Sequence, residues 1–222
     1  MVLHGISGNN IKIIPTVSSW RSLDIATMES KCTGLAQNSS TYGLTGMTSH
    51  MLGNNDWGAC AYFTQSKYGR NGTRVTINNN SNYITGIAGN SIGDTTSTAS
   101  TANSYDTPAG GLASTTGNIY GIYDMVGCAW EYMQDVNHNI DQSIYGTNSN
   151  RKGNAIYETS YADNGLNSWN NEYAYYATSG WPYIVRGGLY YAGAPAGIFS
   201  FSSGDGTPSV SYGFRPVIIP NP

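Results

Sequence analysis

Hydrophobic residues recur at helical spacing in only two stretches, both in the first third of the chain. In the first, apolar positions from Leu23 to Leu35 are separated by polar ones at intervals of about three to four residues. Ser22 is a suitable N-cap, and Gly34 limits the far end. The pattern predicts a helix over roughly residues 22–33.

The second helical stretch has a clearer pattern. Asn54-Asn55-Asp56 offers capping side chains, and apolar residues then recur at three- and four-residue spacing from Trp57 to Thr64. Lys67-Tyr68-Gly69 ends the pattern, because glycine favours a helix C-terminus. We therefore predict a second helix here, with Trp57 on its apolar face.

Beyond about residue 70 the helical period stops, and short apolar runs alternate with Gly, Asn, Ser and Thr. Residues 93–118 contain almost nothing large enough to pack, which predicts a long surface excursion. Two early helices followed by short strands are typical of an α+β protein, and we expect one domain over residues 1–222. A first strand candidate is 11–14, and the later strand-like segments, expected to form one sheet system, are 119–123, 129–134, 183–185, 198–201 and 214–219.

Composition narrows the classes of function. The chain has 222 residues, of which 39% are hydrophobic and only 10% charged, so it has enough apolar material for a core. Ten basic and thirteen acidic residues give a net charge of −3 without clustered lysine or arginine. This excludes the basic surface that a nucleic-acid-binding protein needs. No stretch reaches 18 apolar residues, so we expect no membrane insertion.

Four sequence motifs occur together in the chain. The first, residues 51–62, reads MLGNNDWGACAY, and the second, residues 121–132, reads GIYDMVGCAWEY. Arg186-Gly187-Gly188 and Gly213-Phe214-Arg215-Pro216 follow. This order resembles the formylglycine-generating-enzyme-like branch of the C-type lectin fold. The resemblance implies a C-type lectin fold with two helices, a small and mostly antiparallel sheet, and extensive loops.

The same motifs have a structural interpretation that needs no family. Asp124 and Glu131 stand among apolar residues, so we expect them to accept hydrogen bonds from the backbone or from arginine. Arg186 is then a candidate for a buried partner of Asp124 or Glu131. Gly127 occupies a turn position that favours a positive φ. These residues are expected to brace the fold and not to catalyse.

The chain departs from the enzymes of this branch at the residues that carry catalysis. Those enzymes bind copper through cysteines in the C-terminal part, whereas here no cysteine follows Cys128. Cys32, Cys60 and Cys128 are widely spaced, and the three histidines follow no metal-binding pattern. We therefore expect no enzymatic activity, no metal and no cofactor.

The C-terminal 37 residues, from Arg186 to Pro222, have an unusual composition. They contain no Lys, Glu, Gln, Met or Trp, although the preceding 185 residues contain 23 of these, a rate that predicts between four and five here. These are the five residues that an AAC or AAT codon cannot become by changes at its adenines alone. Mutagenesis directed at adenines would produce a region that lacks these five residue types.

This part of the sequence also resembles the variable proteins of diversity-generating retroelements, which carry a diversified patch on a lectin-like fold. The resemblance implies a diversified region over about residues 187–213. Alternation of Ser200 and Ser202 with Phe199 and Phe201 favours a strand with one packed and one exposed face. The expected ligand-binding residues are Leu189, Tyr190, Tyr191, Ala192, Ala194, Pro195, Ser200, Ser202, Ser203, Asp205 and Tyr212.

The function predicted from these features is ligand recognition without bond chemistry, through a hypervariable C-terminal surface. Tyrosine with Ser, Gly and Ala suits adaptable contacts, as in antibody paratopes. The expected partner is a protein or glycan on a host or neighbouring cell, and the expected location is extracellular, on a bacterial cell surface or a phage particle. Two alternatives remain: a formylglycine-generating-enzyme-like oxidoreductase with a relocated site, which needs Cys60 and Cys128 close together, and an invariant surface adhesin.

Overall fold

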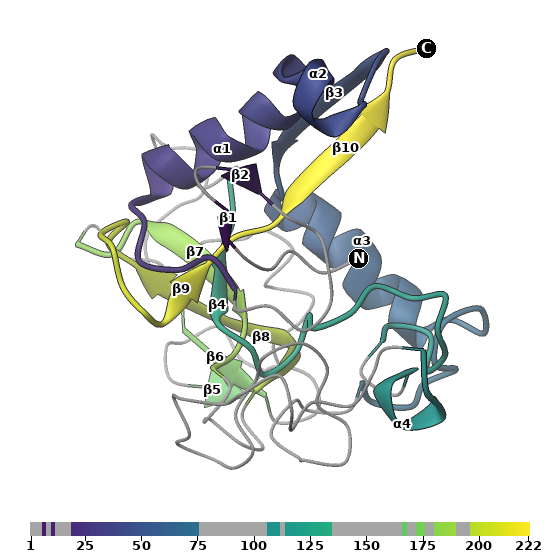
Figure 1. Cartoon of the computed structure of the whole chain (residues 1–222). Helices are drawn as coiled ribbons and strands as arrows, with labels where there is room; N and C mark the ends of the chain where they lie inside the picture. The colour runs from purple at the N-terminus through teal and green to yellow at the C-terminus, as the bar shows by residue number, and fades with distance from the viewer. Residues whose placement is uncertain are drawn as a thin grey trace.

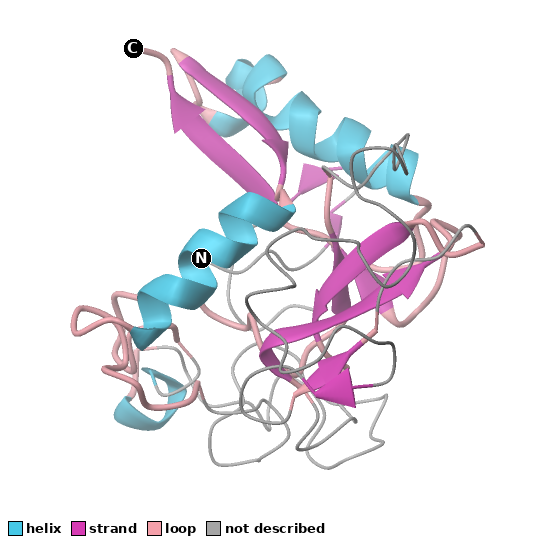
Figure 2. Cartoon of the chain, turned by 180° about the vertical axis from the view of Figure 1, so that it is seen from behind, coloured by secondary structure: helices cyan, strands magenta, loops and turns pink. Residues whose placement is uncertain are grey.

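The computed structural model describes residues 6–7, 10–11, 19–75, 106–111, 114–134, 166–167, 172–175, 180–189 and 196–222. They form helices and sheets together, in agreement with the α+β class (Figures 1 and 2). No helix in these ranges is long and apolar enough to cross a membrane. The helices are α1 (Ile25–Gln37), α2 (Ser39–Tyr42), α3 (Asn54–Gln65) and α4 (Pro108–Gly111). The strands are β1 (Ile6–Ser7), β2 (Asn10–Ile11), β3 (Met47–Met51), β4 (Trp130–Tyr132), β5 (Leu166–Asn167), β6 (Tyr173–Ala174), β7 (Tyr183–Gly187), β8 (Gly197–Gly204), β9 (Tyr212–Gly213) and β10 (Pro216–Pro220).

Helix α1 confirms the first predicted helix but corrects both of its ends. Asp24 is the N-cap, because its Oδ1 accepts a hydrogen bond from the Thr27 backbone N–H at 2.8 Å. Ser22 instead has a φ of 62° and lies before the helix. At the other end α1 continues through Gly34 to its C-cap at Asn38, because the helix buries Leu35 in the core.

Helix α3 confirms the second predicted helix. Gly53 is its N-cap, and the Asp56 carboxylate accepts the Gly53 backbone N–H at 2.9 Å. Trp57, Ala61 and Thr64 are buried along one side, as the three- and four-residue spacing predicts.

Six strands form the main sheet, in the order β5-β6-β8-β7-β4-β9. The pairs β4–β9 and β6–β8 are parallel, and the other three pairs are antiparallel, so the sheet is mostly antiparallel. In the register, Val185 lies opposite Ser202 and Tyr132, while Arg186 lies opposite Phe201 and Glu131. Cross-strand partners share a face, so Val185 and Arg186 mark the two faces of the sheet.

A core cluster lies on each face of the sheet. On the Val185 face, residues of α1 such as Met28 pack with Tyr132 and Val185. On the opposite face, Trp57 of α3 belongs to the second cluster, with Met133 and Phe199. Figure 1 shows α1 and α3 at separate sides of the sheet. The sheet is therefore covered by one helix on each side.

Strand β10 does not join the main sheet. It pairs antiparallel with β3, and Pro216 lies opposite Met51 (Figure 2). The expected single sheet system is therefore wrong, because within the described residues the strands form three sheets. The expected strand at 119–123 is also wrong, since this segment is a turn with one isolated bridge at Tyr123.

The expected surface excursion over 93–118 is too long at its C-terminal end. Its residues up to 105 lie outside the described ranges, but Ser114 and Thr115 are buried. Ser114 Oγ donates to the Asn118 carbonyl at 2.6 Å, and the Thr115 N–H donates to the Ile122 carbonyl at 3.0 Å. Small polar residues order this turn through hydrogen bonds, which apolar patterning does not show.

Candidate functional site

The structure separates the predicted ligand-binding residues by their exposure. Asp205 is exposed, and Leu189, Ser202 and Tyr212 are half-buried. Tyr190, Tyr191, Ala192, Ala194 and Pro195 lie outside the described residues.

Two of the predicted residues do not face solvent. Ser200 is 0% exposed and Ser203 is 5% exposed. Ser203 lies opposite Ile184, on the face of β8 that contains Phe201 and packs in the core. The alternation along β8 is present, but the serine face of the strand is covered as well as the phenylalanine face. The expectation of solvent exposure is therefore wrong for both serines.

A hollow of about 260 Å³ lies over the serine face of β8. Among the described residues, its lining comes from four segments of the chain that are distant in sequence. The lining residues are Trp130, Tyr173, Gly188, Leu189, Ala196, Ser200 and Ser202. Three predicted residues, Leu189, Ser200 and Ser202, thus meet here, and the hollow's lining includes both residues that flank segment 190–195.

The sheet register explains why these side chains meet. Ser202 lies opposite Val185, and Ser200 is two residues earlier on the same face. Trp130 is likewise two residues before Tyr132, which lies opposite Val185. The same face that packs against α1 at Tyr132 and Val185 thus forms the hollow at its other end.

Two aromatic rings form part of the wall. The ring centroids of Trp130 and Tyr173 are 6.3 Å apart, with the planes tilted by 59°. Tyr173 is 39% exposed, whereas Trp130 is buried and belongs also to the α1 cluster. Neither ring is among the binding residues predicted from the sequence. Nothing in the sequence places residues 130 and 173 beside Ser200.

Ser200 stands out chemically in this wall. Within the described part of the chain, its Oγ is buried and has no hydrogen-bond partner. A buried hydroxyl without a partner is uncommon and costs about 1–3 kcal/mol of stability. The hollow therefore contains one polar group that the fold leaves unsatisfied.

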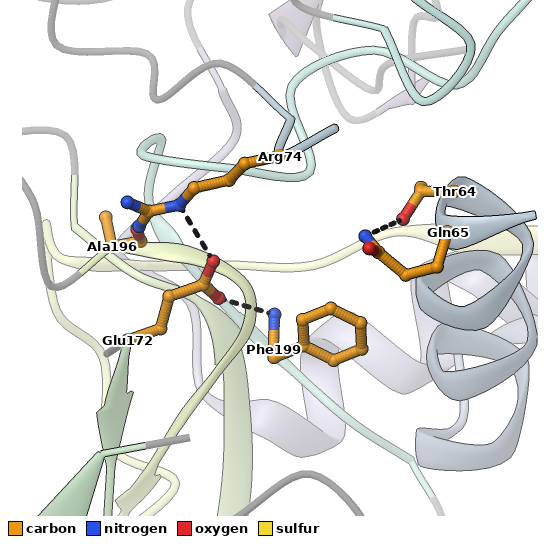
Figure 3. A network of polar contacts seen from close by, with 6 residues as sticks. All are labelled: Thr64, Gln65, Arg74, Glu172, Ala196 and Phe199. Carbon is orange, nitrogen blue, oxygen red and sulfur yellow. Dashed lines mark hydrogen bonds and ion pairs between the residues drawn. The ribbon is translucent and has the colours of Figure 1, made fainter. Parts of the chain in front are cut away.

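A buried carboxylate fixes the strand that carries Ser200 (Figure 3). Glu172 is 0% exposed, and its Oε2 accepts the Phe199 backbone N–H at 2.7 Å. Arg74 Nε lies 3.1 Å from Glu172 Oε1, and Arg74 Nη2 donates to the Ala196 carbonyl at 2.8 Å. Residues 196–199 are thus held from both sides, next to the hollow.

Two positions beside the hollow require glycine: Gly197, next to the Glu172 carboxylate, and Gly188, next to Ala196. A Cβ at Gly197 would lie 1.7 Å from the Glu172 carboxyl carbon. Gly188 has a φ of +82°, and a Cβ there would lie 2.6 Å from the Ala196 Cβ. The backbone approaches its neighbours too closely for a side chain at either position.

The sequence motifs form a second buried cluster, which braces the sheet. Arg215 Nε donates to Glu131 Oε2 at 2.8 Å, and Arg215 Nη2 also donates to Glu131 Oε1. Two further guanidinium bonds, of 3.2 Å each, end on the carbonyls of Tyr123 and Asp124. Burial opposes the charge of Arg215, but the carboxylate of Glu131 outweighs it and raises the pKa of the guanidinium.

The structure confirms the expected burial of Arg186 but corrects its expected ion pair with Glu131. Arg186 is fully buried, as expected, and Gly127 has a positive φ of 71°. The ion pair that the structure shows for Glu131 is with Arg215, whereas Arg186 Nε donates to Asn54 Oδ1 at 2.8 Å. Arg186 was the candidate partner because nothing in the sequence places Arg215 beside Glu131.

Asp205 and Tyr212 are not among the described residues that line the hollow, although Tyr212 lies opposite Trp130 in the β4–β9 register. Tyr212 packs against Tyr132, with ring centroids 4.8 Å apart, and so belongs to the core cluster of α1. Asp205 follows the end of β8 and accepts hydrogen bonds from the Thr207 N–H and hydroxyl at 3.0 and 2.7 Å. These bonds lower the pKa of the Asp205 carboxyl. Of the predicted binding residues that the structure describes, the hollow's lining includes Leu189, Ser200 and Ser202.

The cysteines show no arrangement for metal or redox chemistry in the described ranges. All three are free thiols, and burial raises the pKa of Cys32 and of Cys60, which keeps these thiols protonated. No group of three or more His, Cys, Asp and Glu side chains gathers in the described part of the molecule.

Comparison with known proteins adds no relative. No protein-family model matches the chain, and no curated protein matches it.

Proposed function

We propose that this chain is a ligand-recognition protein of the C-type lectin fold, in its formylglycine-generating-enzyme-like branch. It corresponds to a variable protein of a diversity-generating retroelement and performs no bond chemistry. In this proposal a braced scaffold presents side chains of the C-terminal part to a ligand outside the cell, on a bacterial surface or a phage particle.

The observation that carries the proposal is the hollow beside segment 190–195. Its lining includes Leu189 and Ala196, the residues on either side of that segment. The segment belongs to the 37 residues that lack Lys, Glu, Gln, Met and Trp. A recess next to chain of this composition suits recognition, because rigid aromatic walls and small polar residues provide contact area at low entropic cost.

The surrounding structure supports a fixed scaffold. The Glu172 and Glu131 carboxylates each hold backbone or guanidinium groups from distant segments, and both are buried. Substitutions at half-buried or exposed positions such as Leu189, Ser202 and Asp205 leave these contacts in place. Buried Ser200 and Ser203 are tolerant of fewer replacements, since a larger side chain must fit in a packed interior or fill the hollow.

The coding DNA provides the direct test. We expect a near-copy of the codons for residues 189–215 close to the coding sequence, differing only where the copy has adenine, together with a reverse transcriptase. Sequencing of the locus in a population should then show changes confined to those codons. An invariant C-terminal region with no such copy would contradict diversification and would favour the invariant adhesin.

A further inference from the structure

We infer that the hollow around Ser200 takes one neutral phenol ring, the side chain of a tyrosine presented by a protein partner. The inference rests on the proposed function and names the chemistry of the ligand at this site.

The polar groups of the hollow define the kind of ligand. None of its described lining residues is charged, so this part of the lining offers no counter-ion for a carboxylate or an ammonium group. Among the described lining residues, the side-chain hydroxyls belong to Ser200, which is buried and has no partner within the described chain, to Ser202, which is half-buried, and to Tyr173, which is 39% exposed. Ser200 is 0% exposed, so a ligand hydroxyl reaches its Oγ only when the neighbouring side chains shift; it would then satisfy this group, because a serine hydroxyl both donates and accepts.

The size and the walls of the hollow favour a ring. A cavity of about 150 Å³ holds benzene, and sites for drug-sized ligands begin near 300 Å³. At about 260 Å³ the hollow suits one substituted ring. Trp130 and Tyr173 contribute two aromatic rings to the lining, and a third ring can stack on them or meet them edge-to-face.

Counting hydrogen bonds distinguishes a phenol from the other ring-shaped ligands. A phenylalanine ring would fill the space but would leave Ser200 Oγ unsatisfied. A pyranose sugar has more hydroxyls than the three that Ser200, Ser202 and Tyr173 offer in the described lining, and those that meet Leu189 and Ala196 would lose water without gaining a partner. A phenol has one hydroxyl for the one buried group.

The test titrates the whole chain with three neutral probes: N-acetyl-tyrosinamide, N-acetyl-phenylalaninamide and methyl α-glucoside. Binding is followed by two-dimensional NMR. We expect a Kd on the order of 1 mM for the tyrosine probe, as suits a small fragment. The phenylalanine probe should bind about fivefold more weakly, the effect of one hydrogen bond. The glucoside should show no binding.

Three variants locate the effect. Ser200→Ala should remove the preference for the tyrosine probe, whereas Ser203→Ala, on the opposite face of the same strand, should keep it. Ser202→Phe fills the hollow and should abolish binding of both aromatic probes while the NMR spectrum of the folded chain persists. Equal binding of the two aromatic probes to the unmodified chain, a preference that survives Ser200→Ala, binding that survives Ser202→Phe, or binding of the glucoside alone overturns the inference.

The outcome is independent of the test of the proposed function. A locus without a template copy would remove diversification and leave the tyrosine preference measurable. A locus with the copy, combined with no tyrosine preference, would overturn this inference alone.

Discussion

Two polar clusters of the same sheet differ in how their hydrogen bonds are satisfied. Around Arg215, the guanidinium reaches both oxygens of Glu131 and two backbone carbonyls. Around Ser200, in the described part of the chain, a buried hydroxyl has no partner and faces a hollow. The first cluster stabilises the fold, because removing either Glu131 or Arg215 leaves a buried charge. In the second, no described group satisfies the Ser200 hydroxyl.

The largest expected effect comes from breaking the first cluster. Glu131→Gln leaves the Arg215 charge buried without its counter-ion, and we expect a loss of about 3–5 kcal/mol in the free energy of unfolding. Urea unfolding followed by tryptophan fluorescence measures it. His50→Ala is the control, because His50 Nε2 and Asp56 Oδ2 lie 3.3 Å apart in a half-exposed pair, for which a loss of under about 1 kcal/mol is expected. Equal losses in both variants would contradict the role of burial.

The second-largest loss of stability is expected when the Glu172 carboxylate, which binds the Phe199 N–H of β8, is displaced. Gly197→Ala places a Cβ on the Glu172 carboxylate and should displace it from the Phe199 N–H and from Arg74. We expect a loss of about 1–3 kcal/mol in the free energy of unfolding. Gly180→Ala is the matched control, since a Cβ there meets nothing within 4 Å and should change stability by less than about 0.5 kcal/mol. A neutral Gly197→Ala would show that Glu172 is not fixed by this contact.

Two buried serines, Ser49 with hydrogen-bond partners and Ser200 without one in the described structure, allow the same comparison with one type of side chain. Ser49 Oγ accepts the Ala36 N–H at 2.9 Å and donates to the Thr33 carbonyl at 3.1 Å, so Ser49→Ala should cost about 1–3 kcal/mol of unfolding free energy. Ser200→Ala removes a hydroxyl without a partner in the described structure and should leave stability unchanged or raise it by up to about 1 kcal/mol. Thermal unfolding of the two variants checks this. A clear destabilisation by Ser200→Ala would mean that the fold uses the hydroxyl.

The sequence predicts the helices better than it predicts the site. The spacing from Trp57 to Thr64 reflects local packing of one helix face, and α3 forms where expected. The alternation of Phe199 and Phe201 with the serines correctly predicts two faces of a strand. It cannot show that Ser200 is buried, or that it lines one hollow with Trp130 and Tyr173, because these residues are distant in sequence.

The sequence could not predict that Glu131 pairs with Arg215, because these residues are also distant in the chain. Residues 131 and 215 are brought together by the parallel pairing of β4 with β9, in which Glu131 lies opposite Gly213. Local patterning contains no information on this pairing. The sequence did predict that Glu131 would be a buried acceptor, since a lone acid among apolar residues needs a partner.

The smallest expected effect is at Asp205, the exposed member of the predicted binding surface. Asp205→Ala removes the hydrogen bonds from Thr207, but at an exposed turn we expect a change of less than about 0.5 kcal/mol in unfolding free energy. The folded pKa of this carboxyl lies below its usual value, so its contribution is present above the unfolded pKa and is lost as the pH falls through the folded one. Urea midpoints of the unmodified chain and the variant should therefore differ slightly at neutral pH and converge on acidification. A large loss at neutral pH would contradict the prediction that this position accepts diverse side chains.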